Sequence, residues 1–328
     1  MKIVADDKIP YLKGLAEHLA DEVVYLPGKS ISNEDVRDAD VLIVRTRTRC
    51  NRQLLENTQV KMIVTATIGF DHIDTDYCDF IGIKWTNCPG CNARSVCQYI
   101  RNALTLTGRM QKGKTLGIVG VGHVGSLVAK DAIRNGMNIV LCDPPRKERG
   151  ETFEGREFVD LSEVATKADI ITFHTPLTRE GKYPTYHMAD ADFFNHLANH
   201  PLLINAARGE VVDNEALIKA IDEGKVCDAV VDTWEGEPNI NRELLAKAIV
   251  ATPHIAGYSA DGKANATKMS LMAVADFIGK PFTPTINLPE SELLSVDTLR
   301  SDSDKLKQNP EAFEEFRSNY PIRRETNE

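Results

Sequence analysis

The sequence contains no long apolar run and no excess of positive charge. No stretch approaches the roughly 20 consecutive apolar residues that a membrane-spanning helix needs, and the opening residues MKIVADDKIP lack the apolar core of a secretory signal peptide. With 39 Lys and Arg against 48 Asp and Glu, the formal net charge is -9. Nucleic acids and anionic membrane surfaces bind proteins with a positive excess, so this balance argues against both as partners. We expect a cytoplasmic protein.

Cysteine is sparse and its spacing does not predict a disulfide framework. The chain has 7 cysteines, an odd number, spread over 328 residues, which fits reduced thiols. Cys88 and Cys91 form one CxxC pair with Cys97 nearby, but no second CxxC or HxxxH lies close enough in sequence to complete a structural zinc site. We therefore expect no metal. A redox role for the pair is less favoured than a structural one, because the surroundings are not those of a thioredoxin-like motif.

Short apolar runs alternate with amphipathic segments along most of the chain. KIVAD, EVVYL, VLIVR and MIVTATIG have the length and composition of buried strands, and the alternation resumes at KTLGIVG. Such alternation is typical of parallel sheets with crossover helices. At 328 residues the chain can bury more than one core. We predict an α/β fold of two doubly wound parallel-sheet domains with an active-site cleft between them, plus a short C-terminal extension.

A glycine-rich segment in the second half predicts a dinucleotide site. GVGHVG follows an apolar strand pattern, precedes a helical pattern and has GxGxxG spacing, and the next strand pattern ends at Asp143. Glycines permit the tight turn and close approach to a pyrophosphate at the helix N-terminus, and the carboxylate accepts hydrogen bonds from ribose hydroxyls. A carboxylate there repels a 2′-phosphate, so NAD is favoured over NADP, although Arg146 leaves room for NADP. The expected contacts are Gly120, Gly122, His123, Val124, Gly125 and Asp143.

Two long helical patterns set the predicted domain bounds. They are NARSVCQYIRNALTLTGRM and KANATKMSLMAVADFIG. We predict one domain from residues 1–95 and 263–280, and a second, Rossmann-like NAD-binding domain from residues 96–262. Residues 281–328 are polar and too few to make a core of their own, with one helical candidate around NPEAFEEFRSNY.

Three predicted strands of the second domain end in side chains of different chemistry. Arg208 follows LLINAA, Glu235 and Glu237 follow AVVDTW, and His254 follows IVATP. Because the carboxyl ends of parallel strands meet at one edge of a sheet, these groups can converge there. A carboxylate orients an imidazole and raises its pKa, so that the ring can exchange a proton with an alcohol, and a guanidinium binds a substrate carboxylate. The spacing alone leaves open that one member is structural.

The other histidines are weaker candidates. His18, His187, His196 and His200 lie on polar or helical segments and are interpreted as surface residues. His72, His123 and His174 follow apolar runs without an obvious partner and are interpreted as turn or packing groups.

The stretch VRTRTRC concentrates positive charge in an acidic chain. If it is extended, Arg45, Arg47 and Arg49 leave one face of a strand. A solvated edge that discourages aggregation is one interpretation. An anion-binding site is the other.

The chain resembles the D-isomer-specific 2-hydroxyacid dehydrogenase family in NAARG, WEGEP, PHIAG, GVGHVG, LCDPPR, FHTPLT and VVDTW. The resemblance implies Arg208, Glu237 and His254 as catalytic residues, a flavodoxin-like substrate-binding first domain, and a homodimer, with residues 281–328 as a remnant of a dimerisation region. Further implied NAD contacts are Thr175, Ala206, Ala207, Arg208, Asp232 and Gly257. Implied contacts to a phosphorylated sugar acid are Arg45, Thr46, Thr67 and Tyr258.

Under this resemblance the arginine cluster gains a purpose, because it supplies a positive field for an anionic substrate. Two alternatives stay open. One is a dehydrogenase of a related D-2-hydroxy acid such as 3-phosphoglycerate. The other is a non-catalytic NAD-sensing protein, like the corepressors built on this fold.

Overall fold

The computed structural model describes residues 1–326, which form two compact units. The first contains residues 1–92 and 259–291, and the second contains residues 93–258 and 292–326. The bounds expected from the sequence were 95 and 262, and the assignment of the two domains to substrate and NAD stays a prediction. Residues 292–326 belong to the second unit and do not form a body of their own.

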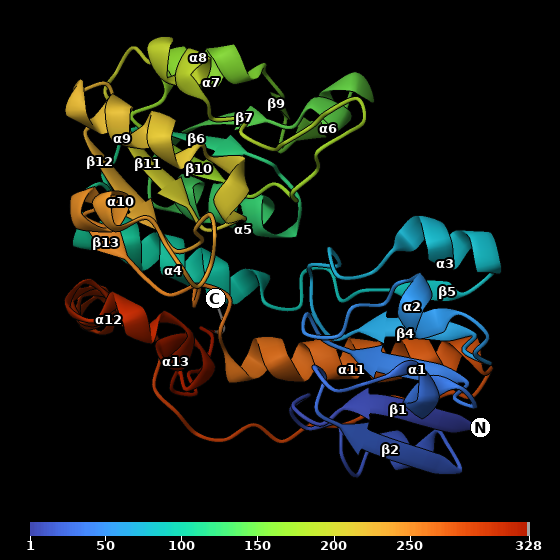
Figure 1. The fold of residues 1–328 in the computed structure, drawn as a ribbon. Helices are drawn as coiled ribbons and strands as arrows, with labels where there is room; N and C mark the ends of the chain where they lie inside the picture. Colours follow the sequence, from blue (N-terminus) through green and yellow to red (C-terminus); the bar gives the residue numbers. More distant parts are fainter. Residues whose placement is uncertain (327–328) are drawn as a thin grey trace. The chain divides into compact units, whose positions relative to one another are not determined.

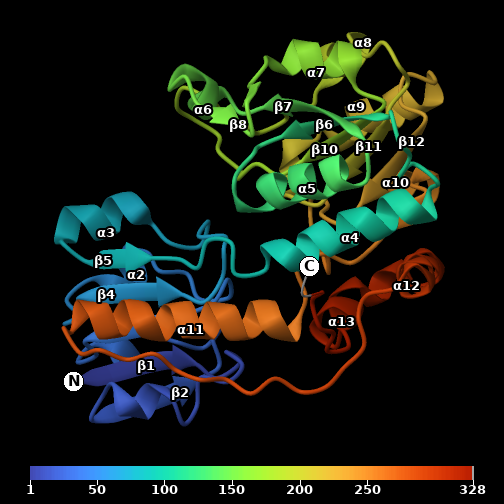
Figure 2. The same cartoon turned by 180° about the vertical axis from the view of Figure 1, so that it is seen from behind.

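The first unit is built on a five-stranded parallel sheet in the order β2-β1-β3-β4-β5. Its strands are β1 (Lys2–Asp6), β2 (Glu22–Leu26), β3 (Val41–Val44), β4 (Met62–Thr65) and β5 (Lys84–Thr86). Helix α11 (Ala260–Phe277) lies on one face, and α1 (Asn33–Val36), α2 (Arg52–Leu55) and α3 (Thr75–Ile81) cover the other (Figures 1 and 2). Coverage of both faces explains why β3, in the middle of the sheet, is apolar at every position.

The second unit is built on a six-stranded parallel sheet in the order β13-β12-β11-β10-β6-β7. Its strands are β6 (Thr115–Val119), β7 (Asn138–Cys142), β10 (Ile170–Phe173), β11 (Leu202–Asn205), β12 (Asp228–Val231) and β13 (Val250–Ala251). Its larger helices are α4 (Ala93–Leu106), α5 (His123–Arg134), α7 (Leu161–Lys167), α9 (Asn214–Asp222) and α10 (Arg242–Lys247). Shorter elements are α6 (Pro144–Glu148), α8 (Ala191–Asn195) and the β8–β9 hairpin (Thr152–Phe153, Arg156–Glu157).

The strand order places the dinucleotide motif where such sites occur. Strand β6 has β7 on one side and β10 on the other, so the chain reverses its direction of travel across the sheet at β6. Open α/β sheets bind ligands at this reversal, outside the carboxyl ends of the strands. The predicted α/β class with parallel sheets is confirmed.

The C-terminal segment forms more structure than expected. It contains α12 (Val296–Gln308) and α13 (Phe313–Ser318), of which only the second coincides with the helical candidate in the sequence. Leu299, Leu306 and Phe313 are fully buried and join the cores of the second unit. Helix α12 was not predicted, because its sequence is mostly polar. Its few apolar residues find a core only when the second unit folds around them.

The extended interpretation of VRTRTRC is wrong. Strand β3 ends at Val44, and residues 45–48 form a turn in which the Thr48 N–H donates to the Arg45 carbonyl at 3.1 Å. Thr48 is buried and its hydroxyl donates to the Gly28 carbonyl at 2.9 Å. The alternation of faces therefore fails, because the hydroxyl of Thr48 is a structural anchor of the turn. Arg47 and Arg49 are exposed.

Three sequence features have simple structural descriptions among residues 1–326. No helix there is long and apolar enough to cross a membrane. The 7 cysteines are free thiols. No group of three or more His, Cys, Asp or Glu side chains is arranged to hold a metal ion. Cys88 is enclosed by the Ala266 carbonyl at 3.2 Å and the Ser270 hydroxyl at 3.4 Å, and burial raises the pKa of its thiol to about 11.

Candidate active site

The glycine-rich loop between β6 and α5 has the form of a phosphate cradle. Gly120 adopts φ +86°, which side chains disfavour, and a Cβ on Gly125 would lie 2.0 Å from the Gly120 carbonyl oxygen. Helix α5 begins at His123 with Gly122 as its N-cap, and both residues are exposed. Unpaired N–H groups at an accessible helix N-terminus attract phosphate, so the residues present fit a dinucleotide pyrophosphate.

Asp143 and Arg146 shape the neighbouring end of β7. The Asp143 carboxylate accepts from the Val121 N–H at 2.9 Å and from the Arg146 N–H at 3.2 Å. The Arg146 guanidinium donates to the Val121 carbonyl at 2.8 Å and pairs with Glu151 at 2.7 Å. Its positive charge is therefore already balanced, which makes it a poor partner for a 2′-phosphate. This arrangement favours NAD over NADP.

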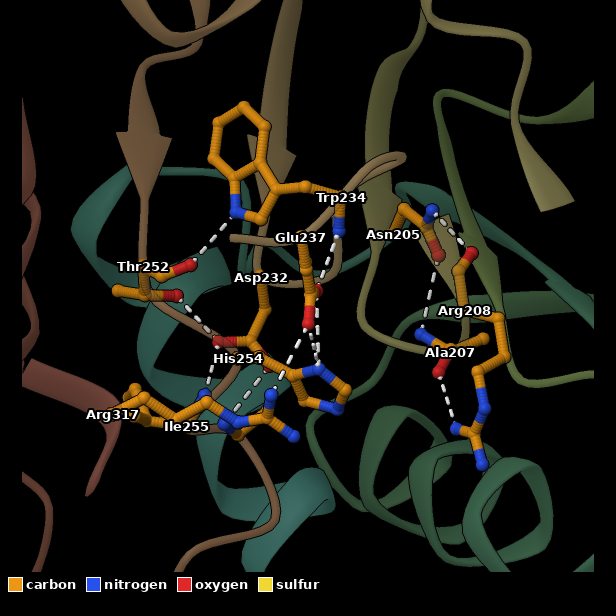
Figure 3. A network of polar contacts seen from close by, with 11 residues as sticks. Asn205, Ala207, Arg208, Asp232, Trp234, Glu237, Thr252, His254, Ile255 and Arg317 are labelled. Atoms are coloured by element: carbon orange, nitrogen blue, oxygen red, sulfur yellow. Dashed lines mark hydrogen bonds and ion pairs between the residues drawn. The ribbon is translucent and has the colours of Figure 1, made fainter. Parts of the chain in front are cut away.

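Three neighbouring strands deliver the predicted catalytic residues to one edge of the sheet. Strands β11, β12 and β13 are adjacent and parallel, and Arg208, Glu237 and His254 lie in the loops after them. The Asn205 side chain fixes the first of these loops by donating to the Arg208 carbonyl at 2.9 Å and accepting from the Ala207 N–H at 3.2 Å. The Arg208 guanidinium donates to the Ala207 carbonyl at 2.8 Å (Figure 3).

Glu237 and His254 are in direct contact. The ring Nδ1 of His254 lies 2.9 Å from Oε2 and 3.1 Å from Oε1 of Glu237 (Figure 3). Burial raises the pKa of Glu237, but the adjacent His254, the hydrogen bonds to the carboxylate and Arg317 together outweigh it and hold the pKa below its usual value. An ionised carboxylate only accepts, so Nδ1 is the donor, and Nε2 is left as the proton-accepting nitrogen.

The carboxylate of Glu237 is itself held in place. The Trp234 N–H donates to its Oε1 at 3.0 Å, and the Trp234 indole donates to the Thr252 carbonyl at 2.9 Å. Trp234 is fully buried, so it ties the loop after β12 to the end of β13. The relative placement of Glu237 and His254 therefore depends on the packing of one large side chain.

His254 has an unusual backbone conformation. Its φ of +56° lies in the left-handed region, which non-glycine residues seldom adopt outside constrained sites. Its N–H donates to the Asp232 carbonyl at 2.8 Å. The Asp232 carboxylate, 1% exposed in the fold, accepts from the N–H groups of Ile255 at 2.8 Å and Ala256 at 3.0 Å. Asp232 therefore stabilises this strained backbone through its carbonyl, which binds the His254 N–H, and through its carboxylate, which binds the next two N–H groups.

Asp232 was expected to contact the cofactor, and its carboxylate is committed to the loop after His254. Besides the two backbone N–H groups it accepts from the Thr252 hydroxyl at 2.7 Å, which in turn meets the Tyr99 hydroxyl at 2.7 Å. Burial raises the pKa of Asp232 above its usual value despite these hydrogen bonds. If Asp232 also contacts NAD, it does so in addition to these structural hydrogen bonds.

The expected substrate residues of the first unit lie around two of its loops. The hydroxyls of Thr67 and Thr65 share a hydrogen bond at 2.7 Å, and the Thr67 hydroxyl also lies 2.9 Å from the Gly69 carbonyl oxygen. The Nε2 of His72 lies 3.1 Å from the Thr65 hydroxyl. Burial lowers the pKa of His72 to about 4, so it is neutral near pH 7. Thr46 is exposed on the turn after β3.

Arg45 and Lys263 bring positive charges together in the first unit. Arg45 donates to the Lys8 carbonyl at 2.7 Å and lies 3.6 Å from the buried carboxylate of Asp6. Burial lowers the pKa of Lys263, and the charge of Arg45 lowers it further. Two neighbouring cations that disfavour each other gain from a bound anion, so this region suits a negatively charged group. Lys263, near the start of α11, belongs to no site motif that the sequence analysis identified, so its role could be seen only in the fold.

The structure also separates the two glutamates that the spacing left open and of which the resemblance chose Glu237. Glu237 meets His254, whereas Glu235 lies 2.5 Å from His187 and accepts from the Asn214 N–H at 3.2 Å. His187 was expected on the surface and is instead half-buried in this second pair. Among the other implied contacts, the Thr175 hydroxyl lies 3.9 Å from the Met188 sulfur, and the ring of Tyr258 packs edge-on to Tyr320. Ala206 and Gly257 are half-buried.

Comparisons with known proteins show the family of the chain. Residues 93–256 match the D-isomer specific 2-hydroxyacid dehydrogenase, NAD binding domain. The chain is 52% identical to an erythronate-4-phosphate dehydrogenase of Bacteroides thetaiotaomicron, with 99% of this chain and 97% of the relative covered. It is 40% identical to an erythronate-4-phosphate dehydrogenase of Proteus mirabilis, with 99% and 93% covered.

Solved structures share the fold. The NAD-bound 3-phosphoglycerate dehydrogenase of Entamoeba histolytica matches with a TM-score of 0.71 at 27% identity, over 90% of this chain and 99% of that chain. A D-lactate dehydrogenase of Aquifex aeolicus, complexed with NAD and lactic acid, matches with a TM-score of 0.69 at 25% identity, over 85% and 96%.

These matches support an enzyme over a non-catalytic NAD-sensing protein, because the relatives are named dehydrogenases. The matched domain is an NAD binding domain and contains the glycine cradle described above, so NAD is the cofactor. The domain match covers half of the chain, and the relatives align with nearly all of it. The chain therefore belongs to the D-isomer specific 2-hydroxyacid dehydrogenase family.

Proposed function

We propose that the chain oxidises 4-phospho-D-erythronate at C2 with NAD, producing 3-hydroxy-2-oxo-4-phosphooxybutanoate in the synthesis of vitamin B6. The observation that carries the chemistry is the contact between Nδ1 of His254 and the carboxylate of Glu237 at 2.9 Å. The choice of substrate is supported by the 52% identical relative, which aligns over nearly the full length of both chains.

His254 is the proposed acid/base. Because its Nδ1 is held by Glu237, Nε2 takes the proton of the C2 hydroxyl during oxidation and returns it during reduction. Glu237 stabilises the imidazolium that forms, and Arg208 binds the substrate carboxylate through its guanidinium. Bound NAD supplies the acceptor for the hydride that leaves C2.

The proposed NAD contacts are the residues of the glycine-rich loop and of the sheet edge. His123 and Val124 at the start of α5 face the pyrophosphate charge, and Asp143 accepts from the adenosine ribose. Gly120, Gly122 and Gly125, proposed from their GxGxxG spacing, let the pyrophosphate approach the backbone. The remaining proposed contacts, carried over from the family resemblance, are Thr175, Ala206, Ala207, Arg208, Asp232 and Gly257.

Residues of the first unit are proposed to contact the substrate. Arg45 is the main candidate for the phosphate, because it carries positive charge next to Lys263, and Thr46 and Thr67 offer hydroxyls. Tyr258 of the second unit is a further proposed substrate contact. The exposed Arg47 and Arg49 add to the positive field that attracts a doubly anionic acid.

The substrate proposal is tested by a screen of related acids. NADH formation is followed by absorbance with 4-phospho-D-erythronate, with unphosphorylated D-erythronate and with 3-phospho-D-glycerate, each with NAD and with NADP. We expect the highest kcat/KM for 4-phospho-D-erythronate with NAD. A higher value for 3-phospho-D-glycerate would overturn the substrate assignment while leaving the proposed chemistry intact.

A homodimer in the cytoplasm completes the proposal. The family resemblance supports the dimer, and the free cysteines among the described residues fit a reducing compartment such as the cytoplasm. Light scattering of the full chain in solution tests the oligomeric state, and a monomer at micromolar concentration would overturn it.

A further inference from the structure

The C-terminal segment reaches the proposed acid/base pair. The Nη1 of Arg317, on α13, lies 3.4 Å from Oε2 of Glu237 (Figure 3). The side chains of Arg317 and Glu237 are 26% and 18% exposed, so the contact is partly shielded from water. Surface ion pairs contribute little, but shielding strengthens the interaction between charges.

Glu237 is therefore shared between an imidazole and a guanidinium. Its Oε2 receives Nδ1 of His254 at 2.9 Å and Arg317 at 3.4 Å, while its Oε1 receives the Trp234 N–H at 3.0 Å. A carboxylate that also serves a permanent cation attracts the imidazole proton less strongly than one that serves the imidazole alone.

Helix α13 is anchored, so this contact is not made by a loosely attached end. Phe313, in its first turn, is fully buried. Farther along, Arg323 is buried and donates through Nη2 to the carbonyls of Ile255 and Ala256, both at 2.8 Å, and through Nε to the Tyr258 carbonyl. The same segment thus contacts both Glu237 and the loop that follows His254.

Other charged or titratable groups also surround His254. Asp232 lies beneath the loop after His254 and is buried. Arg323 binds that loop from the C-terminal segment, and Tyr320 donates to Asp302 of α12 at 2.7 Å. Because these groups contact backbone or one another, Arg317 is the cation that meets the proposed partner carboxylate directly.

We propose that Arg317 is a positioning residue that holds the Glu237 carboxylate and moderates its pull on the proton of His254. The inference rests on the proposed acid/base role of this pair. Loss of the Arg317 charge leaves Glu237 to stabilise the imidazolium alone. The pH at which the enzyme gains its base for oxidation then rises, and the pH at which it loses its acid for reduction rises with it.

The test compares pH profiles of kcat and kcat/KM in both directions for the full chain and for Arg317→Gln, Arg317→Met and Arg317→Lys. In these profiles the ionisation limb is the pH range over which activity changes as the proposed acid/base loses its proton. The Gln and Met variants should move this limb to higher pH by about half a unit to one unit. The Lys variant, which keeps the charge, should restore most of the wild-type position. Arg300→Gln, on α12, is the matched control: it removes the same charge from an exposed position and should leave the limb in place.

A double variant separates charge coupling from a structural effect. In a Glu237→Gln background, removal of the Arg317 charge should cause no further displacement of the limb. An unmoved limb in folded Arg317→Gln or Arg317→Met, or an equal displacement in Arg300→Gln, would overturn the inference. Failure of the wild type to oxidise any 2-hydroxy acid would instead contradict the proposed function, so the two failures are distinguishable.

Discussion

The second unit contains two histidine–glutamate pairs that look alike locally and differ in their surroundings. His254 and His187 are 28% and 27% exposed, and their partners Glu237 and Glu235 come from the same loop after β12. His187 stacks on Tyr186 at 4.0 Å between ring centroids and lies 3.6 Å from a second carboxylate, Asp213. Glu235 also binds the first N–H of helix α9.

His254 instead follows β13 at the carboxyl edge of the sheet, in a left-handed conformation, with its partner held by Trp234 and Arg317. The difference teaches that contact between an imidazole and a carboxylate is insufficient to identify an acid/base. Both pairs draw on loops after strands, so the surroundings separate them: His254 follows β13, whereas His187 and Glu235 join a loop to the start of α9.

The largest expected contrast comes from removing each imidazole. His254→Ala should lower kcat by about 10²- to 10⁴-fold, because a positioned acid/base contributes that much, while NADH binding is retained. His187→Ala should keep kcat near the wild-type value. Steady-state kinetics and NADH fluorescence titration of both variants measure this. Equal losses of turnover in the two variants would remove the distinction between the pairs.

The glutamates should differ in the same direction by a smaller factor. Glu237→Gln keeps the shape of the side chain but removes the charge that stabilises an imidazolium, so kcat should fall by about 10- to 100-fold. Glu235→Gln should leave kcat within about twofold of the wild type, since it lies outside the proposed chemistry. A greater loss in Glu235→Gln than in Glu237→Gln would reverse the assignment.

A third prediction separates chemistry from substrate binding. Lys263→Gln should raise KM for a phosphorylated acid by about tenfold with little change in kcat, because it removes a charge next to Arg45 and leaves both histidine pairs intact. Lys268→Gln, at an exposed position on the same helix α11, is the matched control. An unchanged KM in Lys263→Gln would argue against an anion site there.

The smallest expected effect concerns stability and pH. The pKa of Glu237 is lowered in the fold, so its ionised form stabilises the protein above the unfolded-state pKa, and this contribution disappears as pH falls through the folded-state pKa. Glu237→Gln should therefore be less stable than the wild type near pH 7, with a difference that shrinks below about pH 4. Denaturant unfolding at several pH values measures this. A difference that grows toward acidic pH would contradict the cited direction.

Much of the fold could be predicted from local patterns. The apolar runs identified the central strands, and GVGHVG between a strand and a helix identified the turn before α5, because glycine spacing and helix start are local properties. The contact between residues after β12 and β13 was also predictable, since parallel strands in one sheet end at one edge. That Arg208 acts with this pair stays a prediction.

Predictions failed where distant contacts decide the structure. The turn at residues 45–48 replaced an extended segment because the Thr48 hydroxyl binds Gly28, which lies in a different loop. Helix α12 is mostly polar, and its few apolar residues are buried where it packs against elements remote in sequence such as α4 and β13. His187 is half-buried rather than on the surface, because the fold places the carboxylates of Glu235 and Asp213 beside its ring.

The sequence by itself determined the α/β class, the dinucleotide loop and the identities of the arginine, glutamate and histidine at the strand ends, since these follow from periodicity and residue chemistry. The spacing left Glu235 and Glu237 open, and the family resemblance chose Glu237. Only the tertiary structure showed that Glu235 meets His187 and that Arg317, from the far end of the chain, joins Glu237 and His254. The physical reason is that a side chain's partner is set by packing of elements remote in sequence, such as Trp234 against Thr252 and α13 against the second unit.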